Sequence, residues 1–65
     1  MAQSTEHKEL YLEVGDHVRK IGGDYTFEGL IVARFMKKSG QIRFVVEDDR
    51  GVLHIYSAKN LERDM

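Results

Sequence analysis

The stretch Val52-Leu53-His54-Ile55-Tyr56 is short, β-branched and aromatic, and it follows a turn signal, Asp48-Asp49-Arg50-Gly51. This composition predicts a strand. Because successive side chains of a strand point to opposite faces, Leu53 and Ile55 are expected together on one face, as part of a core. The opposite face is then expected to carry Val52, His54 and Tyr56. It would present an imidazole and a phenol two residues apart, both able to hydrogen-bond a flat ligand.

The length of 65 residues limits the chain to one domain. A domain of this size buries only about 60% of its unfolded surface, and disulfides, metals or oligomerisation often stabilise such domains. The chain has no cysteine, which excludes disulfides and thiolate metal sites, and its three histidines lack the spacing of metal ligands. We therefore expect no metal, and oligomerisation remains as the external source of stability.

The first seven residues lack the apolar segment of a signal peptide, and the aliphatic run Leu30–Ala33 is too short to span a bilayer. Together with the absence of cysteine, this predicts a cytoplasmic protein without membrane contact. The net charge of −1 does not suggest nucleic acid. Residues 19–43, however, carry six basic and two acidic side chains. This basic middle could face phosphates or carboxylates, or it could be a solvated sheet face on which Lys protects edge strands.

The remaining pattern predicts a flexible N-terminal tail over residues 1–12 and one all-β domain over residues 13–65. Alternation of Leu10, Leu12 and Val14 favours an extended lead-in, with a short helix within residues 5–12 as the alternative. Strands are predicted at 17–21, 30–36, 41–48, 52–57 and 61–62, with tight turns at 37–40 and 48–51 and a 3₁₀ turn at 57–60. Phe27, with Tyr25, is expected to pin the loop after the first strand to the core.

Five short strands with these connections predict an SH3-like barrel. A barrel this small is filled by its own side chains, so any ligand must bind on its surface or between copies. Gly22-Gly23 is not followed by a helix, which argues against a nucleotide-binding loop, and Asp48 and Asp49 are expected to cap backbone amides of their turn. A loose KOW-like pattern in Val18–Val32 indicates the fold more than RNA binding.

Four motifs together resemble the plasmid-borne type II dihydrofolate reductases, the trimethoprim-insensitive enzymes. They are Gly15-Asp16-His17-Val18-Arg19-Lys20, Gly29-Leu30-Ile31-Val32, Leu53-His54-Ile55-Tyr56 and Leu61-Glu62-Arg63. That family reads Gly-Asp-Arg-Val-Arg-Lys, Gly-x-Ile-Val, Val-Gln-Ile-Tyr and Leu-Glu-Arg. The resemblance covers residues 14–63, with one extra residue in the loop 22–28. This chain has His54 where the family has Gln, Leu53 for Val and Phe27 for Trp.

The resemblance implies a homotetramer of SH3-like barrels with 222 symmetry, in which one central pore holds NADPH and dihydrofolate end to end. The catalytic residues would be His54 and Tyr56. The cofactor-binding residues would be Lys20, Leu53, His54, Ile55 and Tyr56. The substrate-binding residues would be Lys20, His54 and Ile55. Lys20 is expected to be exposed at the pore mouth, where it would meet anionic groups.

Two other functions fit the residues. One is a non-catalytic SH3-like module that binds a protein partner. The other, the least favoured, is a KOW-like nucleic-acid-binding module that would use Arg19, Lys20, Arg34, Lys37 and Lys38. Oligomeric state separates the reductase from both, because a monomer cannot build the pore.

Overall fold

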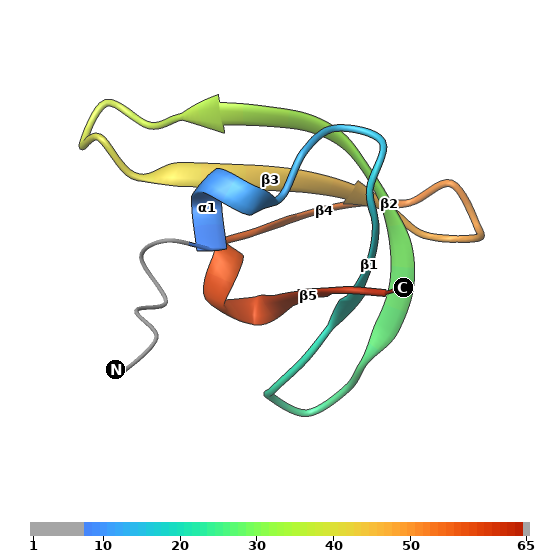
Figure 1. Ribbon diagram of the computed structural model, residues 1–65. Coiled ribbons are helices and arrows are strands. Elements are labelled where there is room, and N and C mark those ends of the chain that lie inside the picture. The colour runs from blue at the N-terminus through green and yellow to red at the C-terminus, as the bar shows by residue number, and fades with distance from the viewer. Residues whose placement is uncertain (1–7, 65) are drawn as a thin grey trace.

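The structure is a computed structural model that describes residues 8–64 (Figure 1). Its elements are α1 (Lys8–Tyr11), β1 (His17–Lys20), β2 (Phe27–Met36), β3 (Ile42–Glu47), β4 (Leu53–Tyr56), the 3₁₀ helix η2 (Ala58–Asn60) and β5 (Leu61–Arg63). The strands form one antiparallel sheet in the order β4-β3-β2-β1-β5. The prediction of a five-stranded, all-β domain is confirmed.

The long strand β2 lies at the centre of this sheet and curves strongly (Figure 1). Its first residues pair with β1, and the segment from Leu30 onward pairs with β3. The register shifts between Ile31 and Ala33, and such an irregularity bends a strand and increases its twist. The strand begins at Phe27, three residues before the predicted start, because the ladder with β1 extends to the pair Lys20–Phe27.

The sheet stays open, whereas the sequence predicts a barrel. Among residues 8–64, β4 pairs only with β3 and β5 only with β1, so no ladder joins the two edge strands. Both edge strands are short, with four and three residues. One edge of β4 and one edge of β5 therefore keep backbone groups outside the ladders.

One face of the sheet, called the inner face here, carries the core. The fully buried side chains are Leu12, Val18, Ile31, Phe44, Val46 and Leu61, with Ala58 beside them. Leu12 is 2% exposed although the sequence places it in the predicted tail. The preceding residues form the short helix α1, not an extended lead-in, and the Arg63 guanidinium donates to the Tyr11 carbonyl at its end. Residues 1–7 of the predicted tail lie outside the described residues.

Both predicted tight turns are present. In the β2–β3 turn, Gly40 has φ of 93° and its N–H donates to the Lys37 carbonyl at 2.8 Å. In the β3–β4 turn, Gly51 has φ of 84° and donates to the Asp48 carbonyl at 3.0 Å. Glycine adopts this left-handed backbone without a steric penalty, which explains its place in both turns. Within residues 8–64, no helix is long and apolar enough to cross a membrane.

Candidate functional site

Strand β4 carries four of the five predicted site residues, and its two faces are the reverse of those predicted. Leu53 and Ile55 are each 59% exposed, whereas His54 and Tyr56 turn toward the inner face. The register with β3 explains this: His54 lies opposite buried Val46, and Tyr56 lies opposite buried Phe44. Directly opposed residues of a ladder share a face. The alternation along the strand is as predicted, but the assignment of Leu53 and Ile55 to the core is wrong.

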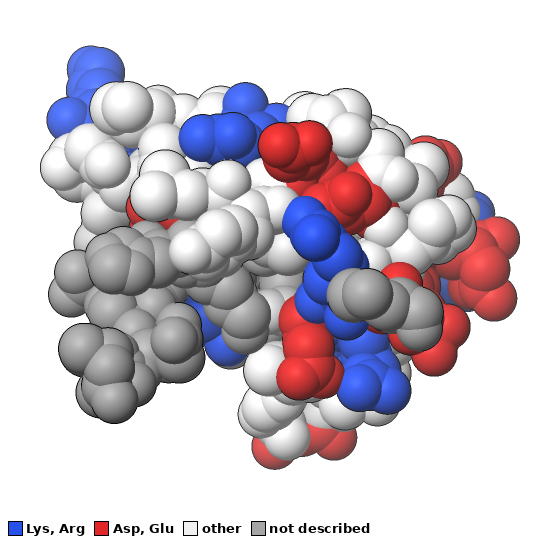
Figure 2. Space-filling view, in the orientation of Figure 1, with Lys and Arg blue, Asp and Glu red and all other residues white. Residues whose placement is uncertain are grey.

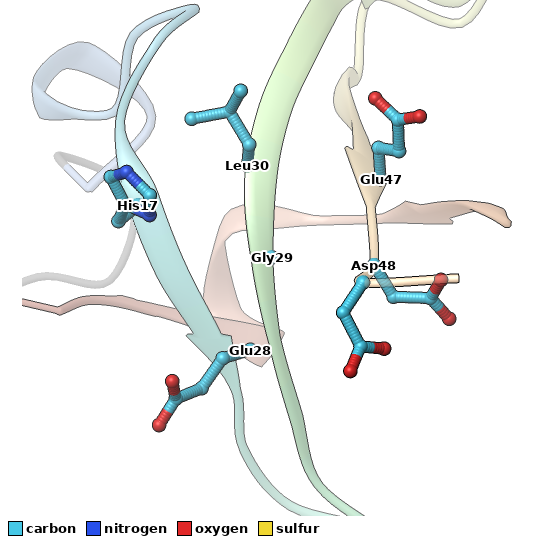
Figure 3. A pocket seen from close by; sticks show the side chains of 7 residues that line it. His17, Glu28, Gly29, Leu30, Glu47 and Asp48 are labelled. Atoms are coloured by element: carbon cyan, nitrogen blue, oxygen red, sulfur yellow. The ribbon is translucent and has the colours of Figure 1, made fainter. Parts of the chain in front are cut away.

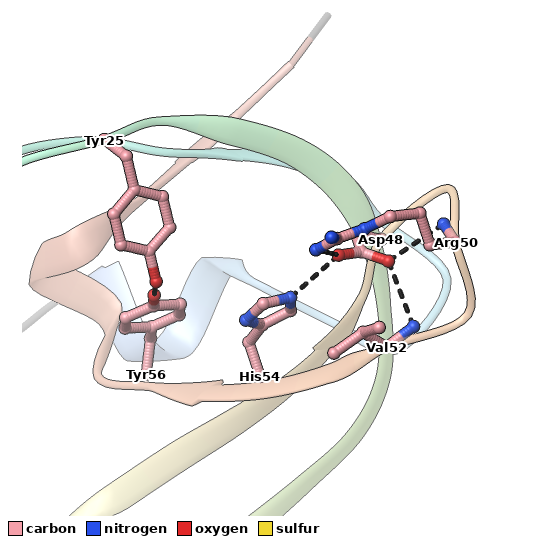
Figure 4. A network of polar contacts seen from close by, with 6 residues as sticks. All are labelled: Tyr25, Asp48, Arg50, Val52, His54 and Tyr56. Carbon is pink, nitrogen blue, oxygen red and sulfur yellow. Dashed lines mark hydrogen bonds and ion pairs between the residues drawn. The ribbon is translucent and has the colours of Figure 1, made fainter.

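His54 forms a close pair with Asp48 at the start of the β3–β4 turn (Figure 4). Its Nε2 lies 2.9 Å from Asp48 Oδ2, and the His54 side chain is 18% exposed while that of Asp48 is 4% exposed. The same carboxylate accepts hydrogen bonds from the Arg50 guanidinium at 2.8 Å and from the backbone N–H groups of Arg50 and Val52 at 2.9 and 3.0 Å. The prediction that Asp48 and Asp49 cap backbone amides is confirmed for Asp48; within residues 8–64 no backbone amide donates to the exposed Asp49 side chain.

These contacts hold Asp48 in its charged form. The hydrogen bond from His54, followed by that from Arg50, holds the pKa of the Asp48 carboxyl well below its usual range. An ionised carboxylate only accepts hydrogen bonds, so the His54 Nε2 that faces it carries a proton. The imidazole that the resemblance assigns to ligands therefore has one ring nitrogen engaged within its own chain.

Tyr56 belongs to an aromatic cluster, defined as Tyr25, Phe27, His54 and Tyr56. The ring centroids of Phe27 and His54 lie 4.3 Å apart, and those of Phe27 and Tyr56 lie 6.1 Å apart. The two phenol oxygens of Tyr25 and Tyr56 are 2.6 Å apart, and this hydrogen bond raises the pKa of Tyr56 to about 12 (Figure 4). Phe27 also packs against the core, so the prediction that it pins the loop is confirmed.

Lys20 is buried, at 6% exposure, and the expectation that it is exposed is wrong. It shares the inner face of β1 with Val18, and the loop that follows the strand folds back over it. Its Nζ donates to the carbonyl oxygens of Gly22 at 2.6 Å and Tyr25 at 3.0 Å. The same atom lies 4.4 Å from the centroid of the Tyr25 ring and 5.6 Å from that of Tyr56, within the range of cation–π attraction.

The predicted site residues thus form two groups on opposite faces of the sheet. Lys20, His54 and Tyr56 come together on the inner face, where each has a polar partner within the protomer. Leu53 and Ile55 lie on the other side, which is called the outer face here. The inner group provides a phenol pair and an imidazole–carboxylate pair, and the outer group provides an uncovered apolar strand at the sheet edge.

The outer face also holds a depression of about 300 Å³ that sequence reasoning did not find (Figure 3). Its apolar floor is Leu30 beside the bare backbone of Gly29, and its rim carries His17, Glu28, Glu47 and Asp49. A Cβ at Gly29 would lie 2.6 Å from the Glu47 carbonyl oxygen, so only glycine lets β2 and β3 approach this closely. Within residues 8–64, no three His, Asp or Glu side chains are placed to share a metal ion.

The roles of these residues toward NADPH and dihydrofolate stay predictions. They depend on the short motifs quoted above and on an assembly of several chains. Comparisons of the chain with family models, curated proteins and solved structures gave no match.

Proposed function

We propose that this chain is a self-associating, SH3-like subunit whose homotetramer reduces dihydrofolate with NADPH at a site between subunits. The observation that carries the proposal is the solvent exposure of the apolar side chains of β4. Leu53 and Ile55 are both 59% exposed, Val52 just before the strand is 44% exposed, and β4 is at the edge of the sheet. An apolar edge strand without Lys or Pro pairs readily with another chain. Further copies that covered this strand would form a shared site that contains the Leu53–Tyr56 segment.

The fit of the residues to NADPH is incomplete within one protomer. Leu53 and Ile55 are accessible to a ligand at an interface. Lys20, which the resemblance assigns to anionic groups, is 6% exposed and already donates to two loop carbonyls. It can meet a phosphate only if the loop after β1 moves. When bound, NADPH would supply the hydride, and the protein residues would bind and orient the two rings.

A non-catalytic interaction module is the second candidate, and the intramolecular contacts of Lys20, His54 and Tyr56 favour it. Groups that are satisfied within the protomer need no ligand to complete them. In this case the exposed face of β4 would serve association alone, with no reaction at the interface.

Two measurements separate these functions. Light scattering at micromolar concentration gives the oligomeric state, and loss of NADPH absorbance with dihydrofolate, in the presence of trimethoprim, gives the activity. A multimer that oxidises NADPH only when dihydrofolate is present supports the reductase. A multimer without this activity supports the interaction module, and a monomer excludes any site between copies.

The variant His54→Gln, which restores the residue of the resembled family, makes the test sharper. If His54 faces the ligands in the assembly, the variant should change the affinity for NADPH and flatten its dependence on pH between about pH 5 and 8. The conservative change Leu61→Met in the core serves as a control for general destabilisation. Identical pH profiles for wild type and His54→Gln would show that the imidazole does not contact the ligands.

A further inference from the structure

The outer face of β2, β3 and β4 has a simple arrangement that follows from the ladder register. Its middle row is Ala33, Val45 and Ile55, which are all apolar. The row on one side is Leu30, Glu47 and Leu53, and the row on the other side contains Phe35 and Arg43. An aliphatic centre thus lies between an acidic and a basic position on the same strand.

The two charges on β3 lie at equal distances from Val45, because each is two residues away along the strand. Within residues 8–64, neither Arg43 nor Glu47 takes part in an ion pair; Arg43 donates to the Ile42 carbonyl and to the Gln41 side chain.

Further charged residues lie at the acidic and basic ends of this face. Glu28 and Asp49 lie on the rim of the depression beside Glu47, and Lys37 and Lys38 lie in the turn beyond Arg43. Figure 2 shows basic atoms at the upper left, where Figure 1 places the β2–β3 turn, and a mixture of acidic and basic atoms in the right half.

We propose that this outer face docks on the outer face of a second copy, with the strands of the two copies antiparallel and a two-fold axis crossing β3 at Val45. In that arrangement Arg43 of each copy faces Glu47 of the other, and the contact occurs twice. The alternative two-fold axis, along the strands, would place Glu47 against Glu47 and Arg43 against Arg43. Electrostatic complementarity selects the first arrangement over the second.

The same two-fold symmetry would place a side chain of the second copy in the depression. Phe35 is in the row of Arg43 and is 41% exposed, whereas Leu30 is in the row of Glu47. Reversal of the strands brings Phe35 of one copy over Leu30 of the other, where the cavity of about 300 Å³ can receive the ring. Ile55, at 59% exposure, meets its own copy near the axis.

A second copy fits better than an unrelated partner because the face is complementary to itself when reversed. An isologous contact of this kind closes with two chains and leaves no unpaired half. The proposal rests on the self-association proposed above, but it does not require the reductase activity. It names the face through which two copies meet.

The test is charge reversal measured by sedimentation equilibrium at low salt. Glu47→Lys and Arg43→Glu should each weaken the dimer about tenfold or more, because two attractive contacts become two repulsive ones. The double variant restores the attraction with the signs exchanged, so its dimer affinity should return to that of wild type. Lys59→Glu, an exposed change on η2 away from this face, is the control and should leave association unchanged.

Each outcome decides the matter. Weakening by both single variants with recovery in the double variant supports the proposed face and its symmetry. A dimer affinity that stays unchanged in all the charge-reversal variants overturns this interface but leaves the self-association in place. If the single variants weaken the dimer and the double variant does not restore it, Arg43 and Glu47 do not face each other across the interface. If the protein is a monomer at every concentration, both the interface and the assembly are overturned. Thermal unfolding at dilution checks that each variant is folded.

Discussion

The orientation of β4 can be tested by comparing two isoleucines. Ile31 on β2 is fully buried, and Ile55 on β4 is 59% exposed. The same change, isoleucine to alanine, removes three carbon atoms at each position. A difference in the free energy of unfolding between the two variants therefore reports the surroundings of the side chain and not its chemistry.

The magnitudes follow from burial. Three methyl or methylene groups correspond to about 2.4 kcal/mol of transfer free energy when fully buried. Because Ile55 has about two fifths of its surface buried, Ile55→Ala should lower the free energy of unfolding by about 1 kcal/mol. Ile31→Ala also leaves a cavity and should lower it by about 2–5 kcal/mol. A domain of this length is stable by only about 3–10 kcal/mol, so the second loss is a large fraction of the total.

Urea unfolding followed by far-ultraviolet circular dichroism measures both losses. The experiment is best done at two protein concentrations, because association stabilises the folded state by mass action. The loss caused by Ile55→Ala should grow with concentration if β4 is part of an interface. Equal losses for the two variants at the lower concentration would refute the outward orientation of Ile55 and return it to the core, where the sequence analysis had placed it.

Three further predictions concern single contacts. Gly29→Ala adds a Cβ 2.6 Å from a backbone oxygen of β3 and should lower the free energy of unfolding by about 1–3 kcal/mol in urea; an unchanged midpoint would show that the strands can separate. Because the pKa of Asp48 is lowered in the folded protein, its ionised form contributes stability above about pH 4 that is lost as the pH falls below this value. Asp48→Asn should therefore flatten the loss of stability on acidification, and parallel curves for variant and wild type would contradict this. Tyr25→Phe removes the hydrogen bond that raises the pKa of Tyr56 to about 12, so Tyr56 should ionise at lower pH in an ultraviolet titration; an unmoved titration would assign the raised pKa to burial.

Local chemistry made the turns and strands predictable. Gly40 and Gly51 follow polar turn residues between apolar runs, and both end the predicted tight turns with a left-handed backbone. Phe44 and Val46 are two residues apart on β3, as period-two alternation requires for a shared face, and both are fully buried in the core. These features depend on residues near one another in the sequence, and so the local sequence pattern is enough to predict them.

The orientation of β4 and the burial of Lys20 depend on distant contacts. Alternation predicts two faces for a strand but does not say which one is buried, and the exposed pair Leu53 and Ile55 is more apolar than the inward pair. Lys20 is buried because a loop returns over β1 and supplies carbonyl acceptors. The Asp48–His54 pair had a detectable signal, since the two residues lie six positions apart across a tight turn and a carboxylate often receives an imidazole proton.

The contacts of Asp48 also bear on the order in which the chain folds. Within residues 8–64, the side-chain partners of Asp48 all lie within six positions of it, whereas the pairing of β1 with β5 joins residues such as Arg19 and Glu62, which are 43 positions apart. Contacts between near neighbours need little loop-closure entropy and form early, and distant pairing comes late. We expect the β3–β4 hairpin to form first around Asp48. The β5 edge would then dock last in folding and be the first strand to exchange its amide hydrogens.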